Sequence, residues 1–277
     1  MALEVAMLSD TAPDVEARMY DAYRRMSPAR KWKNLSQDFR MARVLHAVGM
    51  RQRDPGVSLL AIQSDWINKL LGSPCPGPIP EGLMEPIDQE YQPILRFTLR
   101  TLNRLRIEYA IGGSVASSLH GVSRMTRDAD LTVEPFHGRE ALFVTAFNPA
   151  EYYLNADSVR DALRHRSTFN ILHPGTGYKI DIFVRKDEPF ERAAFARRMP
   201  YPMPDAPDEP VLLHSPEDIV LFKLRWYRIG GEFSEKQWSD ILGVLRTQRD
   251  GLDAAYLDRW ATEIGVQDLL DKIRQQV

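Results

Sequence analysis

The stretch Tyr109–Glu134, YAIGGSVASSLHGVSRMTRDADLTVE, decides the predicted fold of this 277-residue chain. Its short apolar beginning suits a buried strand that ends in a turn at Gly112–Ser114. Small residues and one leucine follow as far as Gly121, as in a short helix closed by a glycine. Residues Ala129–Val133 then read as a second strand. The stretch therefore predicts a strand–helix–strand unit with a polar motif beside each strand.

The two polar motifs have matching chemistry. Gly112 and Gly113 let backbone N–H groups approach a phosphate at the N-terminus of the helix, and Ser114 adds a hydroxyl. The alternation of the second strand places Asp128 and Asp130 on one face. Carboxylates combined with substrate phosphates are the ligands that Mg²⁺ prefers, and Mn²⁺ accepts the same donors. The unit therefore predicts a site for a triphosphate and a divalent cation.

Either motif alone has an ordinary structural interpretation. A Gly-Gly-Ser sequence is usually a turn, and an Asp-x-Asp sequence is usually a solvated loop or a helix cap. Together, with thirteen residues between Ser114 and Asp128, they resemble the signature of the nucleotidyltransferase superfamily typified by DNA polymerase β. That resemblance implies a small mixed β-sheet with flanking helices, phosphoryl transfer assisted by two metal ions, and a third acid on a later strand.

Asp181 is the candidate for the third acid. In the predicted strand 178–184, apolar residues occupy one face, while Lys179 and Asp181 lie on the other. An acid in a mid-sheet strand is costly unless it has a cationic or metal partner. A carboxylate at a sheet edge is the alternative interpretation. The presence of Asp128 and Asp130 favours Asp181 as a third metal ligand.

Composition places the chain among ordinary globular proteins, because 44% of its residues are hydrophobic and 27% are charged. No apolar run approaches the ~20 residues of a membrane-spanning helix, and the N-terminus lacks the basic start of a secretory signal. A single cysteine, Cys75, excludes an intramolecular disulfide framework and fits a reducing compartment. We therefore expect a cytoplasmic protein with no membrane contact.

Basic residues are concentrated near the N-terminus, although the net charge of the chain is only −2. The structural interpretation of this segment is the solvated face of a helix pair. The functional interpretation is a patch for RNA or another polyanion. Against one acid, Asp38, the segment 24–53 contains nine basic residues, namely Arg24, Arg25, Arg30, Lys31, Lys33, Arg40, Arg43, Arg51 and Arg53.

Most of the remaining sequence is predicted to be helical. An apolar stripe from Trp32 to Leu45 indicates the inner face of a long N-terminal helix. The proline-broken segment 200–210 reads as a loop, and Ser215 then begins a helix. The predicted organisation is an α+β protein with a helical N-terminal module (1–72), a Pro/Gly-rich linker (73–88), a nucleotidyltransferase core (89–214) and a helical C-terminal region (215–277).

The C-terminal region extends the resemblance. Residues 215–245, SPEDIVLFKLRWYRIGGEFSEKQWSDILGVL, are similar to bacterial nucleotidyltransferase toxins of the AbiEii and MenT type. The resemblance spans residues 107–248 and implies that Lys223 neutralises triphosphate charge while Asp240 orients it or acts as a base. The structural alternatives are a lysine that reaches solvent and an exposed helix carboxylate. His120 is interpreted as a core histidine, with a nucleotide contact as the alternative.

These features predict a Mg²⁺-dependent enzyme that moves a nucleoside monophosphate from an NTP to an acceptor, either tRNA or a protein hydroxyl. The resemblance to toxins implies an antitoxin as partner. An antibiotic nucleotidyltransferase would share the chemistry and differ in its acceptor. A nucleotide-binding or regulatory protein that keeps the fold without turnover is the alternative from another class, and product formation separates it from an enzyme.

Overall fold

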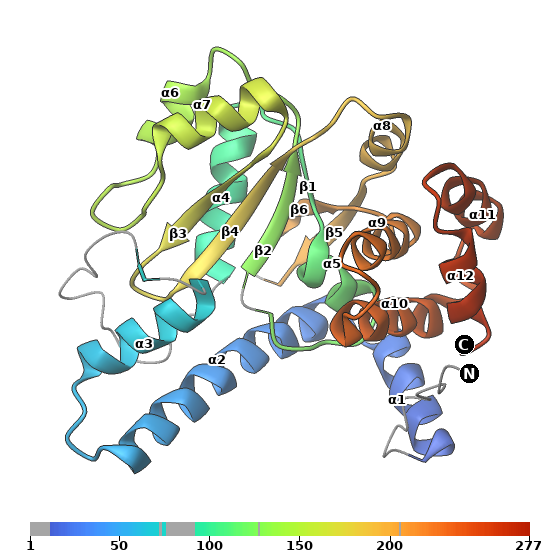
Figure 1. Ribbon diagram of the computed structural model, residues 1–277, viewed down its shortest axis with the longest axis horizontal. Coiled ribbons are helices and arrows are strands. Elements are labelled where there is room, and N and C mark those ends of the chain that lie inside the picture. Colours follow the sequence, from blue (N-terminus) through green and yellow to red (C-terminus); the bar gives the residue numbers. More distant parts are fainter. Residues whose placement is uncertain (1–11, 72–73, 76–91, 127, 205) are drawn as a thin grey trace.

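A six-stranded mixed sheet forms the centre of the molecule, with strand order β3-β4-β2-β1-β6-β5 (Figure 1). The computed structural model describes residues 12–71, 74–75, 92–126, 128–204 and 206–277. Helices flank the sheet, so the α+β prediction is confirmed. The strands are β1 (Tyr109–Ile111), β2 (Asp128–Val133), β3 (Thr168–His173), β4 (Tyr178–Val184), β5 (Met199–Met203) and β6 (Ala206–Leu213).

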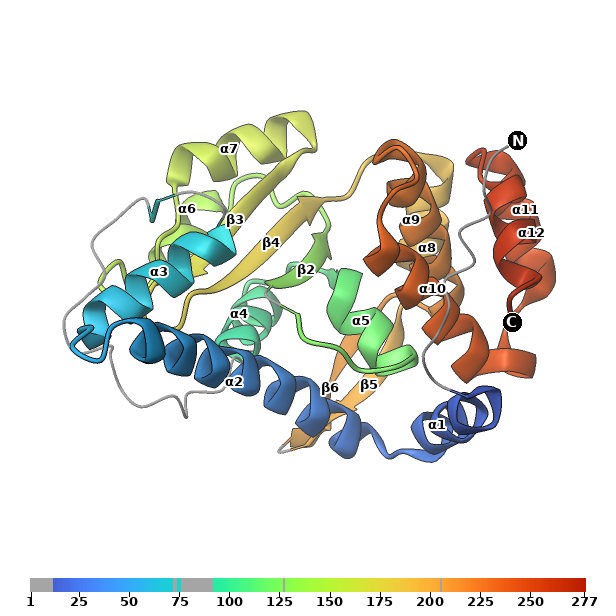
Figure 2. The ribbon, with the colours of Figure 1, turned by 60° about the horizontal axis from the view of Figure 1, so that its bottom comes forward.

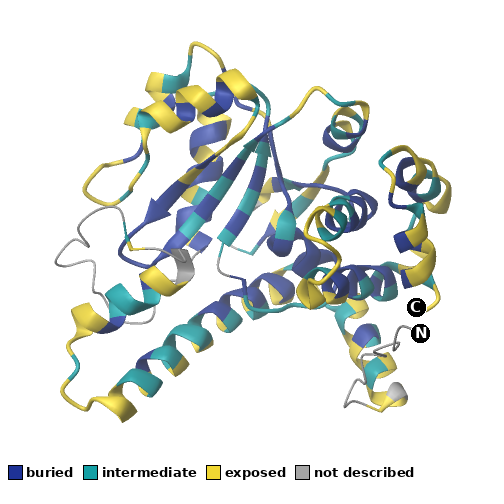
Figure 3. Ribbon diagram, viewed as in Figure 1, coloured by how far each residue is buried: buried dark blue, intermediate teal, exposed yellow. Residues whose placement is uncertain are grey.

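The strands that carry the predicted motifs are neighbours in the middle of the sheet. β2 pairs antiparallel with β1 and parallel with β4. β1 also pairs parallel with β6, while β3 and β5 form the two edges. Along β2 and β4, buried residues alternate with half-buried ones (Figure 3). One face of these strands is therefore packed, and the other is partly open.

Helices build two hydrophobic cores. The first joins the packed side of the strands to α2, α4, α6 and α7, and the second joins α5 and α8 to the C-terminal helices. No helix in the described ranges has the length and apolar character needed to cross a bilayer. The helices are α1 (Pro13–Arg25), α2 (Pro28–Arg53), α3 (Leu59–Leu71), α4 (Gln92–Arg104), α5 (Gly113–His120), α6 (Glu140–Thr145), α7 (Ala156–His165), α8 (Pro189–Ala196), α9 (Pro216–Ile229), α10 (Glu235–Gln248), α11 (Ala254–Glu263) and α12 (Gln267–Arg274), with a 3₁₀ turn at Arg249–Gly251.

The N-terminal helices share the core of the sheet. Trp32 and Phe39 of α2 lie in the same hydrophobic cluster as the β-strands. The Trp32 indole also donates a hydrogen bond to the Pro202 carbonyl at 3.1 Å. In the described part of segment 1–72, residues 12–71 form α1, α2 and α3, and α2 packs into the core of the sheet. Apart from Pro74 and Cys75, the predicted linker 73–88 lies outside the described residues, and the domain boundaries remain predictions.

The predicted apolar stripe of α2 is only partly correct. Trp32, Leu35 and Phe39 are buried, but Leu45 is 63% exposed and Ala47 is buried in its place. The reason is the length of α2, which has 26 residues. The second half of α2 runs beyond the sheet and lies beside α3 (Figure 1). The side of the helix that carries Leu45 is therefore not covered by the sheet.

Some basic residues of segment 24–53 form hydrogen bonds within the protein. Lys31 is buried, and its ammonium donates a hydrogen bond to the Leu119 carbonyl at 2.9 Å. The Arg24 guanidinium donates to the backbone carbonyls of Arg246 and Thr247, each at 2.9 Å. The surface available to a polyanion is therefore smaller than nine basic residues suggest.

The predicted loop at 200–210 is wrong, because this segment contributes to β5 and β6. Their antiparallel register pairs Pro200 with Leu212 and Tyr201 with Val211. β5 is the outermost strand on its side of the sheet. Proline lacks the N–H donor, and an edge strand can accept it because its outward groups need no sheet partner. Pro200 and Pro202 therefore lie on an edge strand, whereas Pro207 and Pro210 lie on β6, ahead of its single register pair with β1 at Leu213.

Candidate active site

The acids predicted from β2 and β4 lie side by side. In the parallel pair of these strands, Asp130 is opposite Asp181 and Asp128 is opposite Lys179. Residues two apart on a strand point to the same side, so all four side chains belong to the partly open face. Three carboxylates and one ammonium are thus gathered at neighbouring positions of the sheet.

The turn between β1 and α5 lies against Asp130. Gly112 N–H donates a hydrogen bond to the Asp130 carbonyl at 2.8 Å. Gly113 has a φ of +52°, and a Cβ atom added there would lie 1.7 Å from Asp130 Oδ2. Such atoms would overlap. Gly113 is therefore required both by its left-handed backbone and by the approach of the Asp130 carboxyl group.

The surroundings of Asp130 favour its protonated form. Burial, followed by the charges of Asp128 and Asp181, raises the pKa of Asp130 to about 7. Burial and then Asp181 also raise the pKa of Asp128. The charge of Lys223 and a hydrogen bond from Ser114 N–H to the Asp130 carboxylate only partly oppose the rise for Asp130. The acids therefore repel one another, and a cation placed among them would be stabilised.

The hydroxyl of Ser114 is engaged inside the protein. It forms a short hydrogen bond with the Thr126 hydroxyl, which donates to the Asp128 carbonyl at 2.9 Å. Ser114 is only 8% exposed. This chain of hydroxyl groups links the start of α5 to the start of β2. Ser114 therefore fixes the relative position of the two motifs, a function that the sequence analysis did not assign to it.

Lys223 of α9 and Asp240 of α10 form a buried ion pair. Lys223 Nζ lies 2.7 Å from Asp240 Oδ2 and also donates to Gln237 Oε1 at 3.0 Å. Arg124 donates to both Asp240 carboxylate oxygens, at 2.5 and 2.6 Å. Burial acts to raise the pKa of Asp240, but the hydrogen bonds from Arg124 and the charge of Lys223 leave that pKa lowered. Lys223 and Asp240 are 5% and 7% exposed, so neither structural alternative, a solvent-reaching lysine or an exposed carboxylate, holds.

This ion pair belongs to the electrostatic surroundings of the three acids. Helix α5 packs against β2, α9 and α10, and so joins the two groups (Figure 2). The pKa of Arg124 is raised by its hydrogen bond to Asp240 and also by the charges of Asp128 and Asp130. The structure therefore brings together all the residues proposed from the sequence, namely Gly112, Gly113, Ser114, Asp128, Asp130, Asp181, Lys223 and Asp240.

Two neighbours of Asp181 were not among the predicted site residues. Lys179 Nζ lies 2.7 Å from Asp181 Oδ2 and 4.0 Å from Asp128 Oδ2. Asn170 of β3 donates a hydrogen bond to Asp181 Oδ1 at 3.0 Å. The sequence contained a signal for Lys179, which shares a strand face with Asp181. Asn170 could be placed only through the register of the β3–β4 hairpin, in which it is opposite Asp181.

The three acids offer the type of ligand atom that a divalent cation prefers. Carboxylate oxygens on adjacent strands are appropriate ligands for Mg²⁺ or Mn²⁺. Across the part of the chain that the structure describes, however, no three His, Cys, Asp or Glu side chains converge to hold a metal ion. The positive charge nearest Asp181 is the Lys179 ammonium. Metal binding by these acids therefore requires a rearrangement of side chains.

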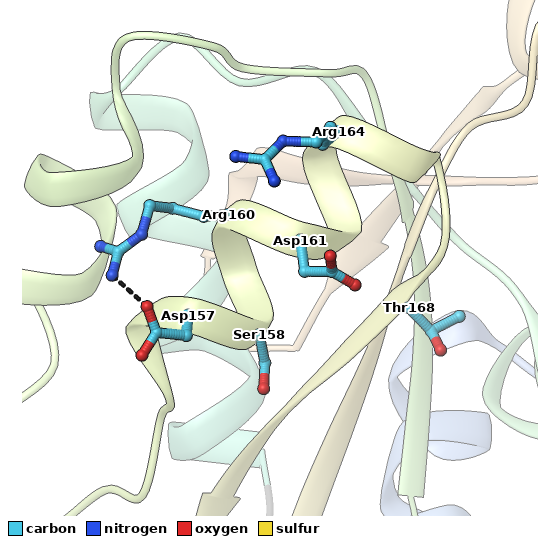
Figure 4. A pocket seen from close by; sticks show the side chains of 6 residues that line it. All are labelled: Asp157, Ser158, Arg160, Asp161, Arg164 and Thr168. Atoms are coloured by element: carbon cyan, nitrogen blue, oxygen red, sulfur yellow. Dashed lines mark hydrogen bonds and ion pairs between the residues drawn. The ribbon is translucent and has the colours of Figure 1, made fainter.

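A surface hollow on α7 lies apart from these residues (Figure 4). Within it the Arg160 guanidinium forms an ion pair with Asp157. The side chains around it carry both signs of charge, so it has no preference for an anion or a cation. Its lining residues are Asp157, Ser158, Arg160, Asp161, Arg164 and Thr168.

Two buried histidines lie next to the turn. His120 Nε2 is 2.9 Å from the His214 carbonyl, and His214 Nε2 is 3.1 Å from the hydroxyl of Thr132 on β2. A Cβ atom added at Gly112 would meet the His214 ring at 3.4 Å. Burial lowers the pKa of each histidine to about 4. Both are therefore neutral at neutral pH, which fits the interpretation of His120 as a core residue.

We expect these histidines to make the protein sensitive to acid. In the unfolded chain they titrate near pH 6.5, whereas in the folded chain they stay neutral to about pH 4. Their contribution to the free energy of unfolding is complete above pH 6.5 and is lost as the pH falls toward 4. In urea titrations, His120→Gln should reduce the loss of stability between pH 6.5 and 4.5 by about 1–3 kcal/mol.

His137→Gln is the matched control, because it removes one imidazole from an exposed position. The pH dependence of stability must be compared between the His120 and His137 variants. Asp130 and Asp218 have raised pKa values, of about 7 and about 6, and contribute the opposite slope in the same pH range. If the His120 and His137 variants follow the same curve, His120 is not held neutral in the folded protein.

No family model matches the chain, and no curated protein matches it either. Among solved structures, the chain is similar to an antigenic nucleotidyltransferase-like protein from Paracoccidioides brasiliensis, with 18% identity, a TM-score of 0.41, and coverage of 66% of this chain and 91% of that one. It is also similar to the antibiotic-resistance factor ANT(2'')-Ia, with 13% identity, a TM-score of 0.39, and coverage of 66% and 96%. At these values the likeness establishes neither the family nor the activity of this chain.

Proposed function

We propose that the protein is a nucleotidyltransferase that moves a nucleoside monophosphate from an NTP to the hydroxyl of an acceptor. The observation that supports this most is the placement of Asp128, Asp130 and Asp181 on one face of two adjacent strands, against the Gly112–Ser114 turn. In the reaction, the acceptor oxygen forms a bond to the α-phosphorus, the bond from that phosphorus to the bridging oxygen breaks, and pyrophosphate leaves. The proton of the acceptor hydroxyl passes to solvent water.

Different residues of the chain would contribute to different parts of this reaction. The turn at the start of α5 places the positive end of a helix beside the acids, which would favour the negative charge of the β- and γ-phosphates. Lys223 and Arg124 supply positive charge near the leaving pyrophosphate, and Asp240 holds both of them by hydrogen bonds. Without a cation, burial and the charges of Asp128 and Asp181 raise the pKa of Asp130 to about 7, and a bound cation would relieve this repulsion.

Asp128, Asp130 and Asp181 would hold Mg²⁺ or Mn²⁺. When bound, such an ion would neutralise phosphate charge and lower the pKa of the attacking hydroxyl. The three strand positions are fixed by the β2–β4 register, and Asn170 restrains Asp181 by its hydrogen bond. The fold would thus fix the strand positions of the three acids, and their side chains would rearrange around the cation.

For the acceptor we propose an RNA, with tRNA as the first candidate, or a protein hydroxyl. Exposed basic residues along α1 and α2 are available to a polyanion, namely Arg25, Arg30, Lys33 and Arg51. An RNA acceptor, together with the toxin resemblance, is consistent with the toxin of a toxin–antitoxin pair. An antibiotic acceptor remains the alternative within the same chemistry.

The test is a transfer assay with the full chain. Each α-³²P-labelled NTP is incubated with Mg²⁺ and, separately, with total RNA, lysate protein and an aminoglycoside mixture. We expect label to enter one acceptor class with release of pyrophosphate. NTP binding without product, measured by calorimetry, would favour the non-catalytic alternative. Absence of both binding and product with all four NTPs would overturn the proposal.

A further inference from the structure

We propose that the Lys179 ammonium is a built-in counter-ion of the acidic site, which competes with the divalent cation and makes metal binding depend on the nucleotide. The inference rests on the proposed function for the identity of the nucleotide, but its central claim concerns only Lys179 and the acids. It assigns to Lys179 a positioning role that the sequence analysis did not give it.

The position of Lys179 is fixed by the fold. It lies on β4 two residues before Asp181 and opposite Asp128 on β2, so its side chain shares their face of the sheet. Its Nζ is 2.7 Å from Asp181 Oδ2 and 4.0 Å from Asp128 Oδ2. The ammonium thus lies between two strands whose acids would otherwise repel each other.

The burial of the group makes this contact strong. The side chains of Lys179 and Asp181 are 24% and 17% exposed, so water screens their attraction only in part. Burial acts to lower the pKa of Lys179, but the hydrogen bond to Asp181 and the surrounding acids leave that pKa raised. Lys179 therefore stays charged and remains paired.

A divalent cation must share Asp181 and Asp128 with this ammonium. A unit charge already in contact with the ligands repels the incoming ion and occupies one of its donors. A triphosphate changes the balance, because it gives Lys179 a second anionic partner and adds oxygens to the ligands of the metal. Metal and nucleotide should therefore bind with positive coupling, and thermodynamic linkage makes the coupling reciprocal.

The decisive measurement is Mn²⁺ binding to the full chain without nucleotide, followed by electron paramagnetic resonance. Lys179→Gln should bind Mn²⁺ about tenfold more tightly than the wild type, since loss of one closely placed charge changes such equilibria by about one pKa unit or more. Lys179→Arg keeps the charge and should bind as weakly as the wild type. Lys186→Gln, an exposed lysine just after β4, controls for loss of a distant charge and should also leave the affinity unchanged.

A second measurement addresses stability and coupling. In EDTA at pH 8, Lys179→Gln should melt at a lower temperature than the wild type, and saturating Mn²⁺ should remove the difference. An α,β-methylene NTP should increase the Mn²⁺ affinity of the wild type more than that of Lys179→Gln. Circular dichroism of each variant shows whether it is folded, and Lys179→Ala, which also removes the charge, replaces the glutamine variant if that variant is not.

Specific outcomes would overturn the inference. Equal or weaker Mn²⁺ binding by Lys179→Gln would show that Lys179 does not compete with the metal, and tighter binding by Lys179→Arg would show that charge is not the cause. If the wild type transfers no nucleotide while Lys179→Gln still binds Mn²⁺ more tightly, the proposed function fails and the counter-ion role stands. If transfer occurs and Mn²⁺ affinity is unaffected, the reverse holds.

Discussion

Asp130→Asn is expected to reduce nucleotidyl transfer by about a thousandfold, because single groups that stabilise reacting charge contribute about 10²–10³ in kcat and Asp130 is a proposed ligand of the cation. Asparagine keeps the size of the side chain and can still accept the hydrogen bond from Ser114 N–H. Labelled product formation at saturating NTP and Mg²⁺ measures the effect. Asp161→Asn, an exposed acid on α7, is the matched control and should retain full activity.

When both proteins are free of metal, Asp130→Asn should be more stable than the wild type. The pKa of Asp130 is raised in the folded protein to about 7, so its ionisation opposes folding between the unfolded value near 3.9 and pH 7. The gain in melting temperature should be complete above pH 7 and vanish as the pH falls toward 4. A less stable Asp130→Asn protein at pH 8 in EDTA would mean that the carboxylate is a structural partner and not a repelled acid.

Gly113→Ala should both destabilise the protein and inactivate it. The left-handed backbone at φ +52° costs alanine about 1–2 kcal/mol, and the overlap of its Cβ with Asp130 Oδ2 adds about 1–3 kcal/mol. The carboxyl group must move for the protein to fold at all, so the site loses its geometry. Urea unfolding and the transfer assay measure the two effects.

Gly138 provides the control, because its backbone is also left-handed but an added Cβ atom would not overlap another atom. Its φ is +80°, and an added Cβ would meet no atom within 4 Å. Gly138→Ala should therefore cost only about 1–2 kcal/mol and leave transfer intact. In an Asp130→Ala background, Gly113→Ala should cost less than in the wild type, since the two nearest atoms are gone. If Gly113→Ala lowered the free energy of unfolding equally in both backgrounds, the overlap with Asp130 would make no energetic contribution.

Local signals in the sequence predicted most elements around the site. The predicted cap at Ser215 accepts a hydrogen bond from the backbone N–H of Asp218, three residues later. Alternation in β2 and β4 gave the correct faces for Asp130 and Asp181, because period two is a property of any strand. These signals depend on neighbours within a few residues, and they were sufficient for the α+β class.

What the sequence could not supply was contact between distant segments. Gly113 was expected to admit a phosphate, but in the structure its missing side chain makes room for Asp130. Lys31 reads as part of a solvated basic face, yet its ammonium is buried against the Leu119 carbonyl. The edge position of β5, which makes its prolines acceptable, appears only when the whole sheet is assembled. Each miss depends on a partner far away in the sequence.

The shared core of α2 and the sheet also sets an order for the biosynthesis of this protein. The apolar face of α2 leaves the ribosome early, but its partners include β5, and the preceding helix α1 contacts the end of α10 through Arg24. At about 5–20 residues per second, the 195 residues between Arg53 and Gln248 take roughly 10–40 s to synthesise. During that interval Trp32, Leu35 and Phe39 are exposed on the nascent chain. The packing of this face against the sheet therefore follows the synthesis of β5, and the contact of α1 with α10 follows later still.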